Sequence, residues 1–321
     1  MNSSLEDFAQ RAHMLTVQRF GKTIKLFAPL YISNECVNDC AYCGFKRDNP
    51  IVRKTLTVDE VVKEAELLIA SGHQHILIVA GEHPKAVNLP FLVAIAQRLR
   101  PQLSQLSLEV QPFDEPTYRT LHEAGYDGVV IYQETYDRDV YRQMHHYGPK
   151  ASFDNRIASI DAAGRAGMRH LGLGVLLGLA DWKKDVAALL EHARGVIQRH
   201  WQSTVSISFP RITPAVDGFM PTHPVSDQEL AEIICTTRLA LPDADLVLST
   251  REPPALRAGL MKLGITRMSA GSRTDPGGYM KPGMAGEQFH LEDQRSSQEV
   301  AHAIANAGYQ PVWKDWDHHL L

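Results

Sequence analysis

The sequence predicts an α/β fold, a (β/α)8 barrel of the TIM type. Short apolar segments typical of buried strands alternate with longer segments whose apolar residues recur at helical spacing, and this alternation occurs eight times. No Pro- or Ser-rich linker interrupts it. Because a long alternation of strands and helices forms a parallel sheet, and eight units are the number that closes a TIM barrel, we favour a barrel over an open sheet.

The first half of the chain contains four strand–helix units. The strand at residues 23–32 is rich in Ile, Leu and Phe, and in the helix at 57–70 the residues Val61, Ala65 and Leu68 recur four and three positions apart. The next three units pair the strand at 75–80 with the helix at 89–100, the strand at 106–110 with the helix at 115–124, and the strand at 128–132 with the helix at 153–166.

The second half continues the same alternation. The expected strands are 171–177, 204–209, 245–249 and 267–270, and the expected helices are 183–200, 227–241, 254–263 and 297–307. We therefore expect an N-terminal helical segment at residues 1–22, the barrel at 23–307 and a C-terminal tail at 308–321 that closes the barrel.

Composition limits the range of functions. The chain has 321 residues, of which 44% are hydrophobic, enough for a full core. Its 33 Lys and Arg against 37 Asp and Glu give a net charge of -4, without the basic excess that nucleic acid or an anionic membrane attracts. No apolar run approaches the roughly 20 residues of a membrane span, and residues 1–19 are polar where a signal peptide is apolar. We expect a cytoplasmic protein with a small substrate and with no nucleic-acid or membrane partner.

Polar residues follow seven of the eight expected strands. They lie at 36–45, 81–83, 109–112, 133–135, 208–211, 249–252 and 269–272. Because the chemistry of a TIM barrel takes place at the carboxyl ends of its strands, this pattern predicts an active site at that face. Strand ends are often polar, which accounts for some of these residues, but not for a carboxylate or an arginine at so many of them.

Three of the four cysteines lie close together in the loop after the first strand. Three residues separate Cys36 from Cys40 and two separate Cys40 from Cys43, whereas Cys235 falls in an expected helix. Three thiolates fit a [4Fe–4S] cluster that keeps one iron open to a substrate. A structural zinc ion would need a fourth ligand at short spacing, and the nearest histidine, His73, follows a whole helix. An inert thiol cluster is a further alternative, which the exposed character of such a loop disfavours.

The cysteine spacing, with an aromatic residue directly before the last cysteine, resembles that of the radical S-adenosylmethionine (SAM) enzymes. From about Arg19 to the C-terminus, longer stretches are similar to 2-iminoacetate synthases, the tyrosine lyases of thiamine biosynthesis. These stretches are 30–34, 42–45, 81–83, 109–112, 132–136, 206–211, 248–252, 276–279 and 311–317. The resemblance implies the (β/α)8 barrel of the radical SAM superfamily.

The resemblance also implies which residues bind the cofactors. Cys36, Cys40 and Cys43 would hold three irons of the cluster, and the amino and carboxylate groups of SAM would bind the fourth. For the rest of SAM, the implied residues are Gly81 and Glu82 for the amino group, Arg156 for the carboxylate, Glu134 for the ribose or the methionine end, and Tyr42 and Phe45 on either side of the adenine. An ordinary helix-surface arginine and plain aromatic packing are the alternative interpretations of Arg156 and of the aromatic pair.

For the substrate, we expect Arg251 to bind the carboxylate. A guanidinium group matches the geometry of a carboxylate, and the end of the seventh strand faces the barrel mouth. Arg211 and Arg273 are the competing candidates. Ser269 and Ser272 could bind polar groups of the substrate, although a buried serine more often bonds to its own backbone.

By the same resemblance, the reaction splits L-tyrosine into 2-iminoacetate (dehydroglycine) and p-cresol, after a 5'-deoxyadenosyl radical from SAM has taken a hydrogen atom from the substrate amino group. Dehydroglycine hydrolyses readily, so thiazole synthase is an implied partner, together with an electron donor of the flavodoxin or ferredoxin type. Two alternatives stay open. One is a radical SAM lyase acting on tryptophan or another aromatic amino acid, and the other is a non-catalytic iron–sulfur or zinc protein, which leaves the polar strand ends unexplained.

Overall fold

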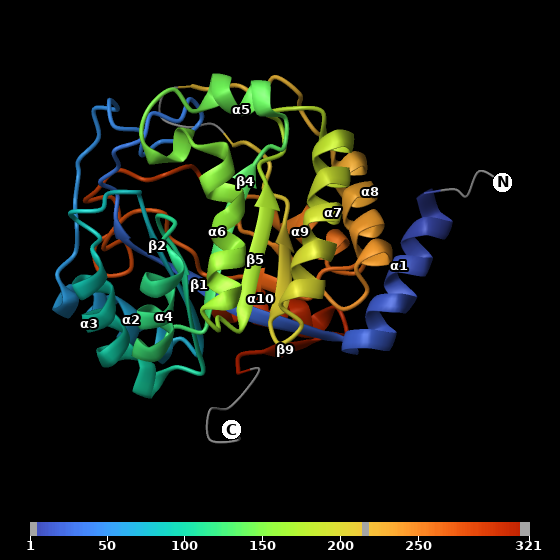
Figure 1. Cartoon of the computed structure of the whole chain (residues 1–321). Helices are drawn as coiled ribbons and strands as arrows, with labels where there is room; N and C mark the ends of the chain where they lie inside the picture. The colour runs from blue at the N-terminus through green and yellow to red at the C-terminus, as the bar shows by residue number, and fades with distance from the viewer. Residues whose placement is uncertain (1–4, 214–217, 315–321) are drawn as a thin grey trace.

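Eight parallel strands close into a barrel that helices surround, as the sequence predicts (Figure 1). The computed structural model describes residues 5–213 and 218–314. The strands follow one another around the barrel in chain order, and β1 completes the ring by pairing with both β8 and β2. They are β1 (Thr23–Ser33), β2 (His75–Ala80), β3 (Gln105–Glu109), β4 (Gly128–Glu134), β5 (His170–Val175), β6 (Thr204–Ser208), β7 (Asp245–Leu248) and β8 (Arg267–Ser269).

Helices surround the barrel, and most of them connect consecutive strands. They are α1 (Leu5–Phe20), α2 (Val58–Ala70), α3 (Leu89–Leu99), α4 (Glu115–Ala124), α5 (Arg138–Met144), α6 (Phe153–Arg165), α7 (Trp182–Arg199), α8 (Asp227–Ala240), α9 (Pro254–Leu260) and α10 (Ser297–Asn306), with short 3-10 turns η1 (Arg100–Gln102) and η2 (Pro149–Ala151). Every expected strand and helix from residue 23 to residue 307 is present, with ends at most three residues from the expected ones. No described helix is both long enough and apolar enough to cross a membrane.

The sequence does not predict α5 or the short strand β9 (Gln310–Val312). Both elements are too short, and too poor in apolar residues, to produce a clear periodicity. β9 pairs in parallel with Thr23–Lys25 of β1, at the end of the barrel opposite the mouth. Residues 315–321 of the expected closing tail lie outside the described residues.

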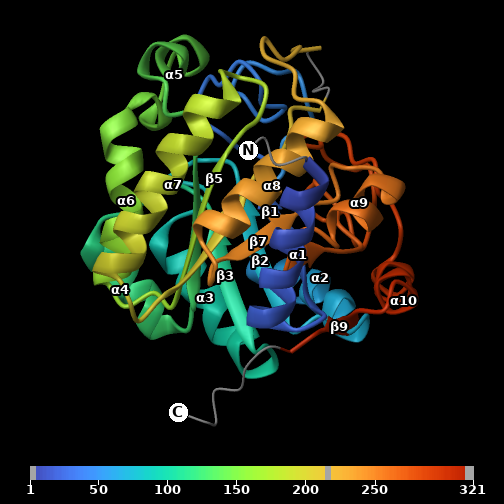
Figure 2. The same cartoon turned by 90° about the vertical axis from the view of Figure 1, so that its right-hand side faces the viewer.

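The N-terminal helix α1 packs against α8 on the outside of the barrel (Figure 2). The guanidinium of Arg238 in α8 lies 4.7 Å from the centroid of the Phe20 ring, and His13 Nδ1 lies 2.8 Å from the carbonyl oxygen of Lys262. α1 therefore stabilises the barrel wall from outside and lies away from the cysteine loop at the mouth.

The barrel interior changes character along its axis. At the end away from the mouth it is ionic, because Asp245 Oδ2 lies 3.1 Å from Lys25 Nζ and 3.3 Å from Arg267 Nη2. Toward the mouth it becomes apolar, with a cluster formed by Phe27, Tyr31, Phe45, Leu77, Val79 and Val130. This apolar cluster lies beneath the polar strand ends and excludes water from the part of the barrel interior that it fills.

A fully buried ion pair fixes the last loop of the barrel. Arg257 of α9 donates to Asp293 and, through Nη2, to the carbonyl oxygen of Ser269 at 2.5 Å. Asp293 also accepts from Arg295 Nε at 2.8 Å, and its backbone N–H donates to the Thr250 carbonyl at 3.1 Å. The loop that follows β8 is thereby attached to the carboxyl ends of β7 and β8.

We expect Asp293→Ala to lower the free energy of unfolding by about 3–5 kcal/mol, because the substitution leaves the buried Arg257 guanidinium without its counter-ion. Urea denaturation followed by circular dichroism measures the change. The matched control is Asp59→Ala, which removes the exposed partner of Arg98 at 3.1 Å and should leave the transition where it is. Equal shifts for the two variants would contradict a structural role for the buried pair.

Candidate active site

The cysteine loop is held from several sides by backbone hydrogen bonds. The backbone N–H of Val37 donates to the Glu82 carbonyl at 2.9 Å, and that of Ala41 donates to the Met144 carbonyl at 2.9 Å. The N–H of Gly44 donates to the Gln288 carbonyl at 3.2 Å. Segments that follow β2, β4 and β8 therefore position a loop that follows β1.

Arg53 holds the far side of the same loop. Its Nη1 donates to the carbonyls of Asn34 at 2.6 Å and Phe45 at 2.8 Å. Its Nη2 donates to the carbonyl of Lys46 at 2.6 Å, with longer contacts to the carbonyls of Arg47 and Asn49. One guanidinium thus fixes backbone on both sides of the cysteines, a task that suits its fork of donors.

Two glycines allow the loop to pack this closely. A Cβ on Gly44 would lie 2.3 Å from the Gln288 carbonyl oxygen, and a Cβ on Gly81 would lie 2.4 Å from the Glu35 carbonyl oxygen. Both obstacles are backbone atoms, which cannot turn aside as a side chain can. Gly81, expected from the sequence at the SAM amino group, therefore also has a packing role beside Cys36.

The three thiols of Cys36, Cys40 and Cys43 line one cavity at the barrel mouth, named here the cysteine cavity. Burial raises the pKa of Cys36 to about 11, and burial likewise raises the pKa of Cys40 although Lys150 opposes the shift. A bound metal centre supplies the positive charge that favours thiolates at such positions. Within residues 5–213 and 218–314, no three His, Cys, Asp or Glu side chains converge tightly enough to bind a single metal ion.

The cysteine cavity contains about 950 Å³ of space not filled by protein atoms, including its open mouth. All of the residues expected around SAM line it, namely Tyr42, Phe45, Gly81, Glu82, Glu134 and Arg156. These residues come from four different segments of the chain, and the barrel brings them together. The size of the cavity suits a small molecule.

Four buried charges form a network along one wall of this cavity. Arg156 Nη1 donates to Glu82 Oε1 at 2.7 Å, and Arg156 Nε donates to the Tyr132 carbonyl at 2.6 Å. Lys150 Nζ donates to Glu134 Oε1 at 2.6 Å, and the same oxygen lies 4.0 Å from Arg156 Nη2. The network alternates in sign from Glu82 to Lys150, so each buried charge has an opposite neighbour.

Glu134 has an unusual backbone conformation. Its φ of 69° lies in the left-handed region, where no other non-glycine residue among those described is found. The register of the β4–β5 pairing shifts at the same place, between Tyr132 and Glu134. Burial raises the pKa of the Glu134 carboxyl, but Lys150 and Arg156 outweigh burial, and the pKa is lowered overall. The residue is therefore an anion inside the cavity, in a backbone position that structures adopt mostly where function requires it.

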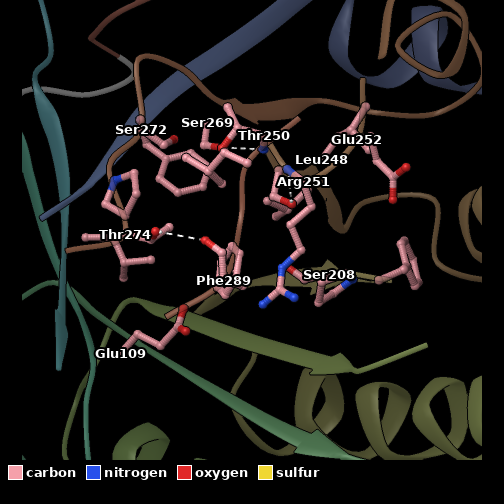
Figure 3. A pocket seen from close by; sticks show the side chains of 18 of the residues that line it. Glu109, Ser208, Leu248, Thr250, Arg251, Glu252, Ser269, Ser272, Thr274 and Phe289 are labelled. Atoms are coloured by element: carbon pink, nitrogen blue, oxygen red, sulfur yellow. Dashed lines mark hydrogen bonds between the residues drawn. The ribbon is translucent and has the colours of Figure 1, made fainter. Parts of the chain in front are cut away.

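A second cavity adjoins the first and is named here the Arg251 cavity (Figure 3). It contains about 790 Å³ of unfilled space, and Arg251, Ser269 and Ser272 line it. The Ser269 hydroxyl accepts from the Thr250 N–H at 3.1 Å, whereas the buried Ser272 hydroxyl has no hydrogen-bond partner among the described residues. Ser272 therefore keeps its hydrogen-bonding capacity for a bound molecule. The wall shared by the two cavities consists of Val79, Glu109, Tyr132, Pro210, Arg251 and Phe289.

The three candidate arginines for the substrate carboxylate differ in their surroundings. Arg251 lies 3.4 Å above the centroid of the Phe289 ring, and within residues 5–213 and 218–314 it forms no ion pair. Arg211 is already paired with Glu252 and, at 2.8 Å, with Asp227. Arg273 is exposed and lines neither cavity. Of the three, Arg251 is the cation with free donors inside a cavity.

The sequence does not single out several residues that the structure places in the site. They are Arg53, Lys150, Gln288, Phe289 and Glu109 as an individual residue. Only Glu109 had a signal, because it belongs to one of the polar strand ends. Arg53, Gln288 and Phe289 lie in loops and Lys150 lies in the turn η2, where the partners of a side chain are set by tertiary packing and not by local pattern.

Comparison with known proteins gives consistent matches over nearly the whole chain. A family model of the Radical SAM superfamily matches residues 30–192, and a model of the Biotin and Thiamin Synthesis associated domain matches residues 208–310. The chain is 44% identical to 2-iminoacetate synthase of Escherichia coli (strain K12) over 317 residues, which cover 98% of this chain and 84% of that protein. It is 43% identical to 2-iminoacetate synthase of Salmonella typhimurium (strain LT2) over 314 residues, which cover 98% and 83% of the two chains.

Among solved structures, the chain is similar to the FeFe-hydrogenase maturase HydG from Carboxydothermus hydrogenoformans. The TM-score is 0.91 and the sequence identity 33%, and the match covers 97% of this chain and 73% of that chain.

We expect Cys36→Ala, Cys40→Ala and Cys43→Ala each to abolish binding of an iron–sulfur cluster, because a three-thiolate site has no spare ligand. Cys235→Ala is the control, since Cys235 is buried in α8 and lines neither cavity. Iron and sulfide content and the visible absorption spectrum after anaerobic reconstitution measure the effect. Loss of iron in the Cys235 variant alone would show that the ligands are assigned wrongly.

Proposed function

The chain belongs to the 2-iminoacetate synthase family of the radical SAM superfamily, and we propose that it cleaves the Cα–Cβ bond of L-tyrosine to give 2-iminoacetate and p-cresol. SAM is converted to 5'-deoxyadenosine and methionine in the same reaction. The family expected from the cysteine spacing and the similar stretches is thus confirmed. The product is the imine of glycine that is used to build the thiazole ring of thiamine, consistent with the second matching family model.

One observation carries the proposal from family to chemistry. The cysteine cavity and the Arg251 cavity adjoin along shared lining residues, so a molecule that binds beside the thiols lies next to a molecule held by Arg251. Cofactor and substrate need this proximity, because a radical must meet its target before it reacts with anything else. A non-catalytic iron–sulfur protein has no use for a second cavity of this kind.

We propose that Cys36, Cys40 and Cys43 hold three irons of a [4Fe–4S] cluster and that SAM binds at the fourth. The donor set fits, because three thiols line one cavity and the described residues offer no fourth cysteine there. When bound, the cluster and SAM supply one-electron chemistry that ends in removal of a hydrogen atom from the substrate. The chain's own part is to hold both molecules and to exclude water.

We propose that the network of buried charges receives the polar parts of SAM. Arg156 suits the carboxylate, and Glu134 suits the ribose hydroxyls or the amino group, as the resemblance implies. Both oxygens of the Glu82 carboxylate already accept hydrogen bonds, from Asn38 Nδ2 at 2.8 Å and from Arg156. Glu82 therefore also orients Arg156, while the remaining lone pairs of its carboxylate stay available to the SAM amino group.

Phe45 and Tyr42, the two aromatic residues expected beside the adenine, have different surroundings. Phe45 is buried among apolar side chains and meets Tyr31 edge to face, with ring centroids 5.9 Å apart. The hydroxyl of Tyr42 is bound to His145 Nε2 at 2.8 Å, which fixes the ring at the cavity wall. Both rings line the cysteine cavity, so each is positioned to pack against a nucleobase.

Tyrosine fits the Arg251 cavity by its chemistry. Arg251 would bind the substrate carboxylate, Ser272 and Ser269 would bind polar groups, and the apolar walls would take up the ring. The apolar lining includes Phe27, Leu77, Val247, Leu248 and Leu291. Burial of an aromatic ring against such residues stabilises the complex and holds the reacting nitrogen in place.

Two protein partners follow from this chemistry. The reaction needs electrons, so a donor of the flavodoxin or ferredoxin type is required. 2-Iminoacetate reacts with water, so it must be passed on quickly, and thiazole synthase is the partner that consumes it.

We expect anaerobic incubation with reductant, SAM and tyrosine to yield p-cresol together with 5'-deoxyadenosine. Parallel reactions with tryptophan and phenylalanine should yield 5'-deoxyadenosine without the corresponding side-chain product. Product analysis by liquid chromatography and mass spectrometry measures both. If tryptophan gave its side-chain product and tyrosine gave no p-cresol, tryptophan would be the substrate instead of tyrosine.

We expect Arg251→Lys to weaken tyrosine binding by about 1.5–3 kcal/mol, or roughly tenfold to a hundredfold, because the variant keeps the charge but loses the paired hydrogen bonds. Formation of p-cresol should collapse while slow SAM cleavage without tyrosine persists, since the residues around SAM are unchanged. Both products are measured in one reaction across a tyrosine titration.

The matched control is Arg273→Lys, which changes an exposed arginine of the loop after β8. This variant should have the tyrosine requirement of the unaltered protein. An unchanged requirement in Arg251→Lys would assign the carboxylate to another residue, and loss of SAM binding would place Arg251 at the cofactor.

A further inference from the structure

Glu109 is the acidic residue at the junction of the two cavities. It is the last residue of β3, and its side chain lines both the cysteine cavity and the Arg251 cavity. Figure 3 shows Glu109 and Arg251 reaching into the Arg251 cavity from opposite sides. Part of the Glu109 surface faces the cavities and is not covered by protein. The residue is therefore in reach of a molecule bound in either cavity.

Glu109 differs from the other carboxylates that line the two cavities. Glu82 is paired with Arg156, Glu134 with Lys150, and Glu252 with Arg211. The Glu109 carboxylate, by contrast, forms no hydrogen bond or ion pair with any of the described residues. Because Glu109 lines both cavities and is partly uncovered there, its carboxylate is free to accept a hydrogen bond from a bound molecule.

The surroundings of Glu109 make it a carboxyl group that can exchange a proton near neutral pH. Burial and repulsion by Glu134 raise its pKa to about 7, although Arg251 opposes the shift. The charged and titratable groups that face it are Glu134, Arg251, Lys150, Arg156, Tyr31 and Tyr132. A general base is most effective when its pKa lies close to the working pH.

The substrate has one group that fits this position. An amino acid carries its carboxylate and its ammonium group on the same carbon, so a carboxylate held by Arg251 places the ammonium group beside the same wall. The phenol, at the other end of the molecule, would then extend into the apolar part of the Arg251 cavity. The proposed reaction also requires the nitrogen to face the cysteine cavity, and Glu109 lies at that boundary.

We propose that Glu109 accepts a proton from the ammonium group of bound tyrosine, which converts it to the neutral amine before a hydrogen atom is removed. In this step one N–H bond breaks, its electron pair stays on nitrogen as a lone pair, and the proton forms an O–H bond on Glu109. No oxidant or reductant is involved. The proposal rests on the proposed function, and it gives Glu109 a catalytic role that Arg251 and the serines do not cover.

Ligand binding tests the position of the ammonium group. The proteins are anaerobically reconstituted holoenzymes with SAM and without reductant, and equilibrium dialysis measures the dissociation constants near pH 8. We expect Glu109→Gln to weaken tyrosine binding about tenfold to a hundredfold, the size of a lost hydrogen bond to a charged group. Binding of hydroxyphenylpropanoate, which is tyrosine without its amino group, should be almost unchanged. Glu123→Gln, an exposed site on α4, is the control and should change neither ligand.

The pH profile tests the proton transfer. Glu109 accepts a proton only when it is ionised, so p-cresol formation at limiting tyrosine should rise as the pH increases through about 7. Glu109→Gln should lose this rise together with most of the p-cresol, while SAM cleavage without tyrosine continues. Glu109→Asp keeps a carboxylate but moves it away from the substrate nitrogen. This variant should therefore show the rise of p-cresol formation with pH, at a lower rate than the unaltered protein. Iron content and circular dichroism show whether each variant is folded and loaded.

Three results would overturn the proposal. Equal weakening of tyrosine and hydroxyphenylpropanoate would mean that Glu109 does not recognise the amino group. Weakening of tyrosine but not of phenylalanine would place Glu109 at the phenol. An unaltered pH profile in Glu109→Gln would assign the proton to another group. If the unaltered protein made no p-cresol at all, the proposed function would fail, while the comparison of ligands with and without an amino group would still report on Glu109.

Discussion

The arrangement of the cysteine cavity depends on a single requirement, that the charges in its wall must be paired. Glu82, Arg156, Glu134 and Lys150 meet this requirement by alternating in sign from the end of β2 to the turn η2. Loss of Arg156 would leave Glu82 without a cation, and loss of Glu134 would leave Lys150 without an anion. Either loss would be far more costly than the loss of a surface pair. Through Asn38, which donates to Glu82 and accepts from the Lys150 N–H, the network also holds the cysteine loop. Three loops from different strands therefore behave as one unit.

Charges are paired within the network, but Arg251 and Glu109 in the Arg251 cavity are unpaired. The network is nearly neutral, because its cations and anions satisfy each other. In the Arg251 cavity, Arg251 is kept in place by the face of Phe289 and by a 3.4 Å contact with a carbonyl, and Glu109 has no partner among the described residues. Contacts with a ring and a carbonyl fix the orientation of a guanidinium group without neutralising its charge. The two unpaired charges, opposite in sign, are complementary to the two charges of an amino acid.

The sequence predicts the barrel and the grouping of three cysteines at its mouth because both have local signals. Apolar residues recur with a period of two in strands and of 3.6 in helices. The spacing of Cys36, Cys40 and Cys43 can be read directly from the sequence. Arg251 could be predicted from its place at a strand end. Arg53 and Lys150 could not, because their roles depend on carbonyls and carboxylates that come close only after folding. The left-handed Glu134 also has no sequence signal, since glycine and asparagine are the residues that usually indicate that conformation.

The contact between the cysteine loop and the segment around Gln288 has a consequence for biosynthesis. Gln288 lies 245 residues after Cys43, yet its carbonyl accepts from Gly44 and its Nε2 lies 3.7 Å from the Cys43 sulfur. During translation the cysteines leave the ribosome long before this segment is made. The loop reaches its final geometry only when almost the whole barrel has been synthesised, so the nascent chain carries three unprotected thiols for most of that time. A cluster that requires this geometry would be inserted late, and until then a reducing environment would be needed to prevent disulfides among the three thiols.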